Sequence, residues 1–279
     1  MRAVISGPPI FQHKHSLENT ATIVIGERAD EGVAFNPNGC EVIFAHDSGC
    51  WVGDQKAIQQ CHLAEFDAFL LELTLGWALA DLPADPKARA VEAMAVGTSA
   101  ILERCAAEAP AYVAAGTGLT VPVLSAGIST SGITGKAATT PARIAQPYLT
   151  NALAVTGGGT GPAAALGALE AKLVDASDHI GGGGTIWASP AHFGGATGIQ
   201  DQVCEHNGGL YTIATGSRVI VGNIGPDEMY ATIGGVDLYL GPIEILDAEN
   251  RKQNEYIVQV ERYGVAVWNI CAAFKRAAV

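Results

Sequence analysis

Charged residues are scarce in this chain of 279 residues, since Asp, Glu, Lys and Arg make up only 16% of it. About a quarter is usual for a soluble domain. A chain with so little charge either buries much of its surface against partners or exposes few loops. Its 34 glycines add backbone freedom that packing has to overcome. The composition therefore favours an obligate oligomer. Its length allows each subunit one or two domains.

Clusters of basic residues are missing. The net charge is −12, and no basic run is longer than a pair such as Lys275-Arg276. A protein that grips nucleic acid through its phosphates needs a basic face, because neutralising phosphates and releasing their counterions drives that binding. The charge balance therefore argues against a dedicated DNA-binding protein.

Long apolar runs are absent too. No stretch reaches the roughly 18 consecutive apolar residues of a membrane span, and Met1–Ile5 leads straight into Gly7-Pro8-Pro9 without the apolar core of a signal peptide. We expect no membrane partner, synthesis in the cytoplasm and reduced thiols. The cysteines are too widely spread for a small disulfide scaffold. They are Cys40, Cys50, Cys61, Cys105, Cys204 and Cys271.

Recognisable catalytic and metal-binding motifs are lacking. There is no Gly-x-Ser-x-Gly turn and no His-Glu-x-x-His sequence, and the cysteines lack the Cys-x2-Cys spacing of zinc sites. Asp175, Asp178 and His179 stand close together, but before a glycine run, where polar loop residues are ordinary. The remaining metal candidates are His13, His15, His46, Cys50, Cys61 and His62. We interpret these as scattered side chains and expect no catalytic residue, no metal and no cofactor.

One glycine-rich turn is the exception. Thr156–Pro162 follows an apolar stretch and precedes a helix, which is the layout of a phosphate-binding turn. No Lys-Ser/Thr pair follows it, the preceding residues lack alternating strands and helices, and Pro162 removes an N–H near the helix start. A hinge or a turn leading into the helix is our preferred interpretation. A nucleotide-binding enzyme using Gly157–Gly161 is the alternative.

The clearest predicted element is a helix over residues 85–109. Asp85 is a favoured N-cap and Pro86 suits the first helical position. An apolar stripe follows at steps of three and four residues, and it comprises Val91, Met94, Thr98, Ile101 and Cys105. Off this stripe lie Glu92, Glu103, Arg104 and Glu108. Such a helix would be roughly 36 Å long.

The other predicted elements are less distinct. Residues 1–35 read as an extended arm with a short strand at 20–25, and residues 39–80 fit either a helix or a strand over Phe69–Leu75. Helices are expected at 163–176 and 191–204, and strands at 185–189, 210–215, 218–222 and 236–240. A long last strand is expected at 256–271. A bulge is expected at Gly264, because the apolar residues change there from even-numbered to odd-numbered positions.

The order of these parts resembles the shared capsid fold of tailed bacteriophages. The helix at 163–176 is followed by the glycine break Gly181–Gly184 and by a strand that ends in Ser189-Pro190. Then come Gly216-Ser-Arg-Val-Ile-Val-Gly222, an Asn223-containing link, and a last strand with the pair Glu261-Arg262. The resemblance covers about residues 85–275 and, more loosely, residues 35–80, and it is closest to structural proteins of phages that infect actinobacteria.

The resemblance implies an α+β capsid fold with five parts. These are an N-terminal arm (1–38), an extended loop with a peripheral strand (39–80), a peripheral domain (81–145) with its spine helix (85–109), an axial domain (146–245), and a return to the peripheral domain (246–279). It favours a strand for Phe69–Leu75. It also implies that the arm and the 39–80 segment reach over neighbouring subunits.

The implied function is structural and not enzymatic. The chain would be a subunit of an icosahedral capsid that assembles with itself into pentamers, hexamers or both and encloses double-stranded DNA without sequence-specific binding. A second capsid or decoration protein and a separate scaffold are further partners that the family allows. Its place would be the virion, after assembly in the host cytoplasm; an encapsulin-like compartment shares the fold. If the arm only contacts neighbours, deleting residues 1–30 should leave a folded subunit that forms no stable shell.

Overall fold

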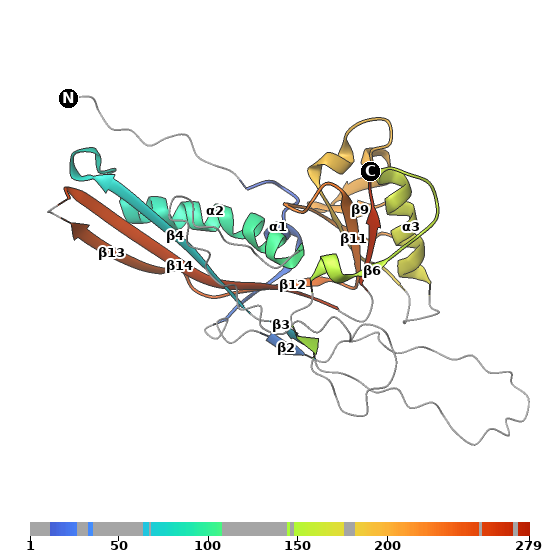
Figure 1. Cartoon of the computed structure of the whole chain (residues 1–279), viewed down its shortest axis with the longest axis horizontal. Coiled ribbons are helices and arrows are strands. Elements are labelled where there is room, and N and C mark those ends of the chain that lie inside the picture. The colour runs from blue at the N-terminus through green and yellow to red at the C-terminus, as the bar shows by residue number, and fades with distance from the viewer. Residues whose placement is uncertain are drawn as a thin grey trace, which may run out of the picture.

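The protein folds as an α+β chain with two larger sheets and one small one (Figure 1). The computed structural model describes residues 12–26, 33–35, 64–66, 68–107, 144–145, 148–175, 182–250, 253–269 and 273–279. The small sheet has the order β2-β3-β5. Its strands are β2 (Val33–Phe35), β3 (Ala64–Phe66) and β5 (Ile144–Ala145). The predicted α+β class is confirmed.

A five-stranded sheet forms the elongated half of the molecule. Its order is β1-β12-β14-β13, and β4 pairs with the other edge of β14. The strands are β1 (Thr22–Ile25), β4 (Phe69–Ala78), β12 (Val236–Leu240), β13 (Glu244–Asn250) and β14 (Glu255–Trp268). Strand β4 confirms the strand interpretation of Phe69–Leu75. The helix α2 (Pro86–Ala107) lies along the ribbon of β4, β14 and β13 and covers one of its faces (Figure 1).

Helix α2 starts where the sequence predicts. Asp85 Oδ1 accepts a hydrogen bond from the backbone N–H of Ala88 at 2.8 Å, which is the expected N-cap contact. The buried stripe is only partly the predicted one, because Leu102 is buried while Ile101 is 52% exposed. Glu103, predicted to lie off the packed face, is fully buried. The helix is covered on this second side by the N-terminal segment, which periodicity alone does not reveal.

The long strand β14 has no bulge at Gly264. Its pairing with β4 runs unbroken from Glu255 to Gly264. On its other edge, residues 241–243 of the facing chain lie opposite only two residues of β14, so the extra residue is on the facing side. The apolar parity shifts after Gly264 because residues 265–268 are buried on both faces of the sheet. The bulge prediction for this strand is wrong.

A seven-stranded sheet forms the other half, in the order β6-β15-β11-β7-β10-β9-β8. Its strands are β6 (Leu153–Ala154), β7 (Gly184–Ala188), β8 (Val203–His206), β9 (Gly209–Thr212), β10 (Arg218–Val221), β11 (Glu228–Ile233) and β15 (Ala273–Ala277). Helix α3 (Pro162–Val174) packs against β11 and β15 and buries Leu166, Leu169 and Leu173. All five residues of β7 are buried.

The predicted helix at 191–204 is wrong. The chain there forms two short 3₁₀ turns, η5 (Pro190–Phe193) and η6 (Gln200–Gln202), followed by β8. Glycines at 194, 195 and 198 interrupt the stretch, and their low helix propensity explains the outcome. The sequence also gave no signal for the central strand β11, whose apolar residues do not alternate.

The two sheets exchange strands across the predicted domain boundary at residue 245. Strand β12 lies before that boundary, yet it pairs with β1 and β14 in the five-stranded sheet. Strand β15 lies after it, yet it pairs with β11 and β6 in the seven-stranded sheet, where Phe274 joins the apolar core. Backbone pairing therefore links β12 and β15 to the halves on the other side of the predicted boundary.

The N-terminal segment packs on its own chain. Strand β1 runs parallel to β12, and Leu17, in the short helix α1 (Leu17–Thr20), is fully buried in the core between α2 and the five-stranded sheet. The expectation that these residues reach over a neighbour is corrected for 12–26. Deleting residues 1–30 would remove Leu17 from this core, so we no longer expect a folded subunit from that deletion.

Candidate functional site

The glycine-rich turn wraps around a side chain of its own protein. Gly157, Gly158, Gly159 and Gly161 all have positive φ, which suits glycine and strains other residues. The guanidinium of the buried Arg276 donates to Val155 O at 3.0 Å and to Gly159 O at 2.8 Å. The carbonyl groups of the turn therefore point at an arginine that belongs to β15.

The backbone at the start of α3 is also in contact with other parts of the protein. Pro162 has no N–H, and the N–H of Ala163 donates to Thr197 O at 2.9 Å. A Cβ at Gly161 would lie 3.1 Å from Cβ of Thr197. The N–H of Ala163 is therefore not available to a phosphate, and together with the carbonyl groups that face Arg276 this favours the interpretation of Gly157–Gly161 as a turn leading into the helix.

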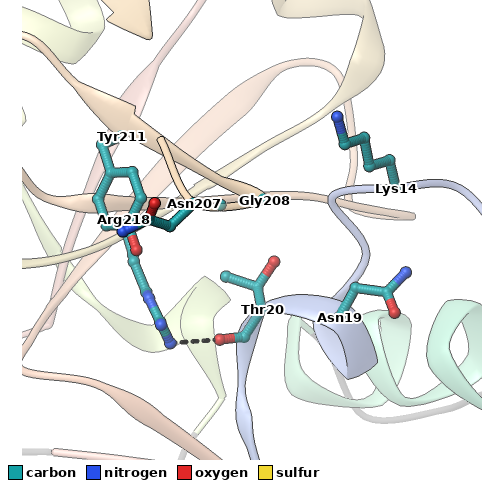
Figure 2. Close-up of a pocket in the computed structure, with 8 residues that line it drawn as sticks. Lys14, Asn19, Thr20, Asn207, Gly208, Tyr211 and Arg218 are labelled. Atoms are coloured by element: carbon teal, nitrogen blue, oxygen red, sulfur yellow. Dashed lines mark hydrogen bonds between the residues drawn. The ribbon is translucent and has the colours of Figure 1, made fainter. Parts of the chain in front are cut away.

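A cavity of about 420 Å³ lies between the N-terminal segment and the β8–β9 hairpin (Figure 2). It is lined by Lys14, Asn19, Thr20, Asn207, Gly208, Gly209, Tyr211 and Arg218. Arg218 Nη1 donates to Thr20 O at 2.5 Å, as Figure 2 shows, and Lys14 pairs with Glu205. Both cations are thus used to fasten the N-terminal segment. Among the described residues that line it, none has a carboxylate, thiol or imidazole for acid–base or nucleophilic chemistry.

Glu103 joins three parts of the molecule. Its Oε1 accepts from the N–H of Leu17 at 2.8 Å and from Ser99 Oγ at 3.1 Å, and its Oε2 accepts from the N–H of Asn223 at 2.7 Å. Gly222 leaves room for it, because a Cβ there would lie 2.7 Å from Glu103 Cδ. The carboxylate therefore connects α1, α2 and the end of β10, which belongs to the other sheet.

Most of the residues weighed for metal binding and catalysis lie outside the part of the chain that the structure describes. His46, Cys50, Cys61, His62, Asp178 and His179 lie outside the described residues, as do Cys40 and Cys271. Asp175 ends α3 and pairs with Lys172 at 2.8 Å. Within the described ranges, no three His, Cys, Asp or Glu side chains form a group that could hold a metal ion.

The two cysteines in the described part of the chain are free. Cys105 is buried, and burial raises the pKa of its thiol to about 12, so the thiol stays protonated at neutral pH. Cys204 is exposed. Among the described helices, none has the length and apolarity that crossing a membrane requires.

Comparison with solved structures identifies the fold. The capsid of a native GTA particle has 14% identity and a TM-score of 0.50, covering 99% of this chain and 93% of that one. The capsid of an empty GTA particle gives 13% and 0.53, with the same coverages. The SrpI encapsulin of Synechococcus elongatus gives 11% and 0.50, covering 100% of this chain and 92% of that one.

No family model and no curated protein matches the sequence. The similarity to solved structures nevertheless spans both sheets and α2, from end to end of the chain. This chain has the capsid fold that GTA capsids and encapsulins share, as the sequence predicted. The closeness to phages of actinobacteria stays a prediction.

Proposed function

We propose that this chain is a structural subunit of an icosahedral capsid of the tailed-phage type, which encloses double-stranded DNA. The observation that supports this most is the end-to-end similarity to the two GTA capsids. The seven-stranded sheet then corresponds to the axial domain, and the five-stranded sheet with α2 to the peripheral domain. We assign the chain no enzymatic role.

The surface of the isolated subunit supports assembly with copies of itself. Large apolar side chains are exposed at places far apart in the fold, including Ile25 on the edge strand β1, Ile213 beside β9 and Leu246 on β13. Apolar surface at several separate places suits a subunit with several different neighbours. In a closed ring, one surface of each subunit meets a different surface of the next. Pentamers and hexamers are the closed rings we propose.

Purification of the expressed chain tests the proposal. We expect rings or closed shells by size-exclusion chromatography with light scattering and by negative-stain electron microscopy. A monomer or small oligomer that stays so over a wide range of protein and salt concentration would contradict it. Saturable binding of labelled GTP or NAD by such an oligomer would favour the nucleotide-binding alternative.

An encapsulin-like compartment is the second candidate, because the SrpI encapsulin matches the whole chain as well. Particles isolated from cells that make this protein naturally distinguish the two. Nuclease-resistant double-stranded DNA inside the particles supports the phage capsid. Particles that hold a protein cargo and no DNA support the compartment. Decoration or scaffolding proteins would appear as additional bands when the same particles are analysed by gel electrophoresis.

A further inference from the structure

The ribbon formed by β4, β14 and β13 has two different faces. The side chains of Leu71, Val258 and Val260 point towards α2 and are buried, and Lys87 Nζ of α2 contacts Asp247 Oδ1 at 2.7 Å. Successive strand residues alternate between faces, so the intervening residues lie on the opposite face. There, the side chains of β4 and β13 are exposed and those of β14 are exposed or half-buried.

Three carboxylates form a row across this outer face. Glu72 of β4 and Glu244 of β13 both lie directly opposite Glu261 of β14. Gln259 Nε2 donates to Glu261 Oε1 at 2.6 Å and to Glu72 Oε1 at 3.2 Å. None of the ion pairs recorded for the described residues includes any of the three carboxylates. Like charges directly opposite one another destabilise a sheet, so a cation brought by a partner would stabilise this row.

Apolar side chains flank the carboxylate row on the same face. Leu70 is 48% exposed and lies opposite Tyr263, which is 37% exposed. On the other side, Leu246 is 58% exposed and lies opposite Gln259. We call these six side chains of Leu70, Glu72, Glu244, Leu246, Glu261 and Tyr263 the acidic face. Its partner should combine positive charge with apolar side chains.

One long segment of the same chain has this composition. The 35 residues 109–143 contain no Asp or Glu, although the chain has 28 of them, and they include Lys136 and Arg143. They also carry apolar residues such as Val121, Leu124 and Ile133. Of the other long segments that the structure does not describe, 36–63 contains Glu41, Asp47 and Asp54 against a single lysine. Of these two long segments, charge complementarity therefore favours residues 109–143.

We propose that the acidic face of each subunit binds residues 109–143 of a neighbouring copy, with Lys136 and Arg143 opposite the carboxylate row. The inference rests on the proposed function, because a shell supplies the neighbouring copy. The contact is an electrostatic one at a surface, so it weakens as salt screens it. It is heterologous, since one surface of the subunit meets a different surface of the next.

A fluorescent peptide of residues 117–143 tests the contact directly on the full-length chain, at a protein concentration low enough that the subunits are dissociated and their acidic faces are unoccupied. We expect saturable binding by fluorescence anisotropy that weakens as NaCl is raised. The variant Glu72→Gln/Glu261→Gln should bind it about tenfold more weakly, which corresponds to two surface charge contacts. A peptide with Lys136→Glu and Arg143→Glu should bind the unchanged chain as weakly. The absence of saturable binding would overturn the inference.

Matched controls separate this contact from a general charge effect. Glu92→Gln/Asp201→Asn removes the same number of exposed carboxylates elsewhere, from α2 and η6, and should leave peptide binding unchanged. The reversal Glu72→Lys/Glu261→Lys should bind the peptide carrying Lys136→Glu and Arg143→Glu better than the unchanged peptide. Equal effects of the control pair and the acidic-face pair would also overturn the inference.

The outcome is independent of whether shells form. If the chain forms shells but neither acidic-face variant alters peptide binding, this contact is wrong and the capsid function stands. If the chain forms no shells but the peptide binds through the acidic face, the capsid function is wrong and the contact stands.

Discussion

His192 has both ring nitrogens in use inside the protein. Nδ1 accepts from the N–H of Ser189 at 3.1 Å, and Nε2 lies 2.8 Å from Pro226 O. Since a backbone N–H can only donate, Nδ1 carries no proton and Nε2 donates to the carbonyl. The side chain is buried. The neutral imidazole thus holds the loop before β11 against η5.

Burial lowers the pKa of His192 from its usual 6.5, partly offset by the hydrogen bond to Pro226. The unfolded chain therefore binds this proton more readily, and the stability that neutral His192 gives is complete above pH 6.5 and is lost as the pH falls below it. We expect the free energy of unfolding in urea to decrease between pH 8 and pH 5.5. One such group contributes at most about 1.4 kcal/mol per pH unit.

The variant His192→Gln provides the comparison. Its unfolding free energy should be lower at pH 8, and it should fall less than that of the unchanged protein on going to pH 5.5. A residual slope is expected from His15, whose pKa burial also lowers. The lowered pKa values of Glu205 and Asp247 act below pH 4.5, outside this window. An unchanged slope in the variant would show that His192 does not couple folding to pH.

Between elements, the packing of α2 on the sheet depends on Gly264. A Cβ at this position would lie 2.9 Å from Leu102 Cδ1 and 3.1 Å from Leu240 Cδ2, so the helix could not approach β14 as closely. We expect Gly264→Ala to lower the free energy of unfolding by about 1–3 kcal/mol, as overpacking of a core does. Thermal or urea unfolding followed by circular dichroism measures it.

Gly76 of β4 is the matched control, since a Cβ there would meet nothing within 4 Å. Gly76→Ala should be neutral or slightly stabilising, because alanine restricts the unfolded chain. Two equally destabilising alanines would mean that loss of glycine flexibility, and not contact with Leu102, causes the effect.

The sequence predicted the helices α2 and α3, because capping residues and apolar periodicity depend only on neighbouring residues. Asp85-Pro86 specified the start of α2, and the leucines of 163–176 specified α3, because caps and helical periods act within a few residues. Strand β11 was missed because burial on both faces removes its alternation. The apolar residues of segment 69–75 fit both the helical and the strand periodicity. Only the family resemblance favoured the strand that the structure has.

At the scale of the whole molecule, Glu103 links the five-stranded and seven-stranded sheets, and no sequence pattern indicated this contact. Its position on α2 falls off the apolar stripe, where a glutamate is normally solvated. Its carboxylate is buried and accepts hydrogen bonds from Ser99 of the same helix and from two distant backbone N–H groups, those of Leu17 and Asn223. A contact of this kind depends on the complete fold, so neither periodicity nor composition could predict it. The same holds for Arg276, which fills the glycine-rich turn.

Glu103→Gln tests this link. The amide nitrogen of glutamine would face an N–H donor, and a buried donor left without an acceptor costs about 1–3 kcal/mol. We therefore expect a loss of that size in the free energy of unfolding, measured in urea. Glu92→Gln, an exposed site on the same helix, should change it by no more than about 0.5 kcal/mol. Equal small changes in both variants would contradict the linking role.

The position of β15 has a consequence during translation. This strand lies between β6 and β11, yet it comprises residues 273–277, made after every other strand of its sheet. A nascent chain on the ribosome therefore holds β6 and β11 without their shared neighbour. The seven-stranded sheet closes only once these residues have left the ribosomal exit tunnel, so this half of the molecule cannot complete its folding before residues 273–277 are made.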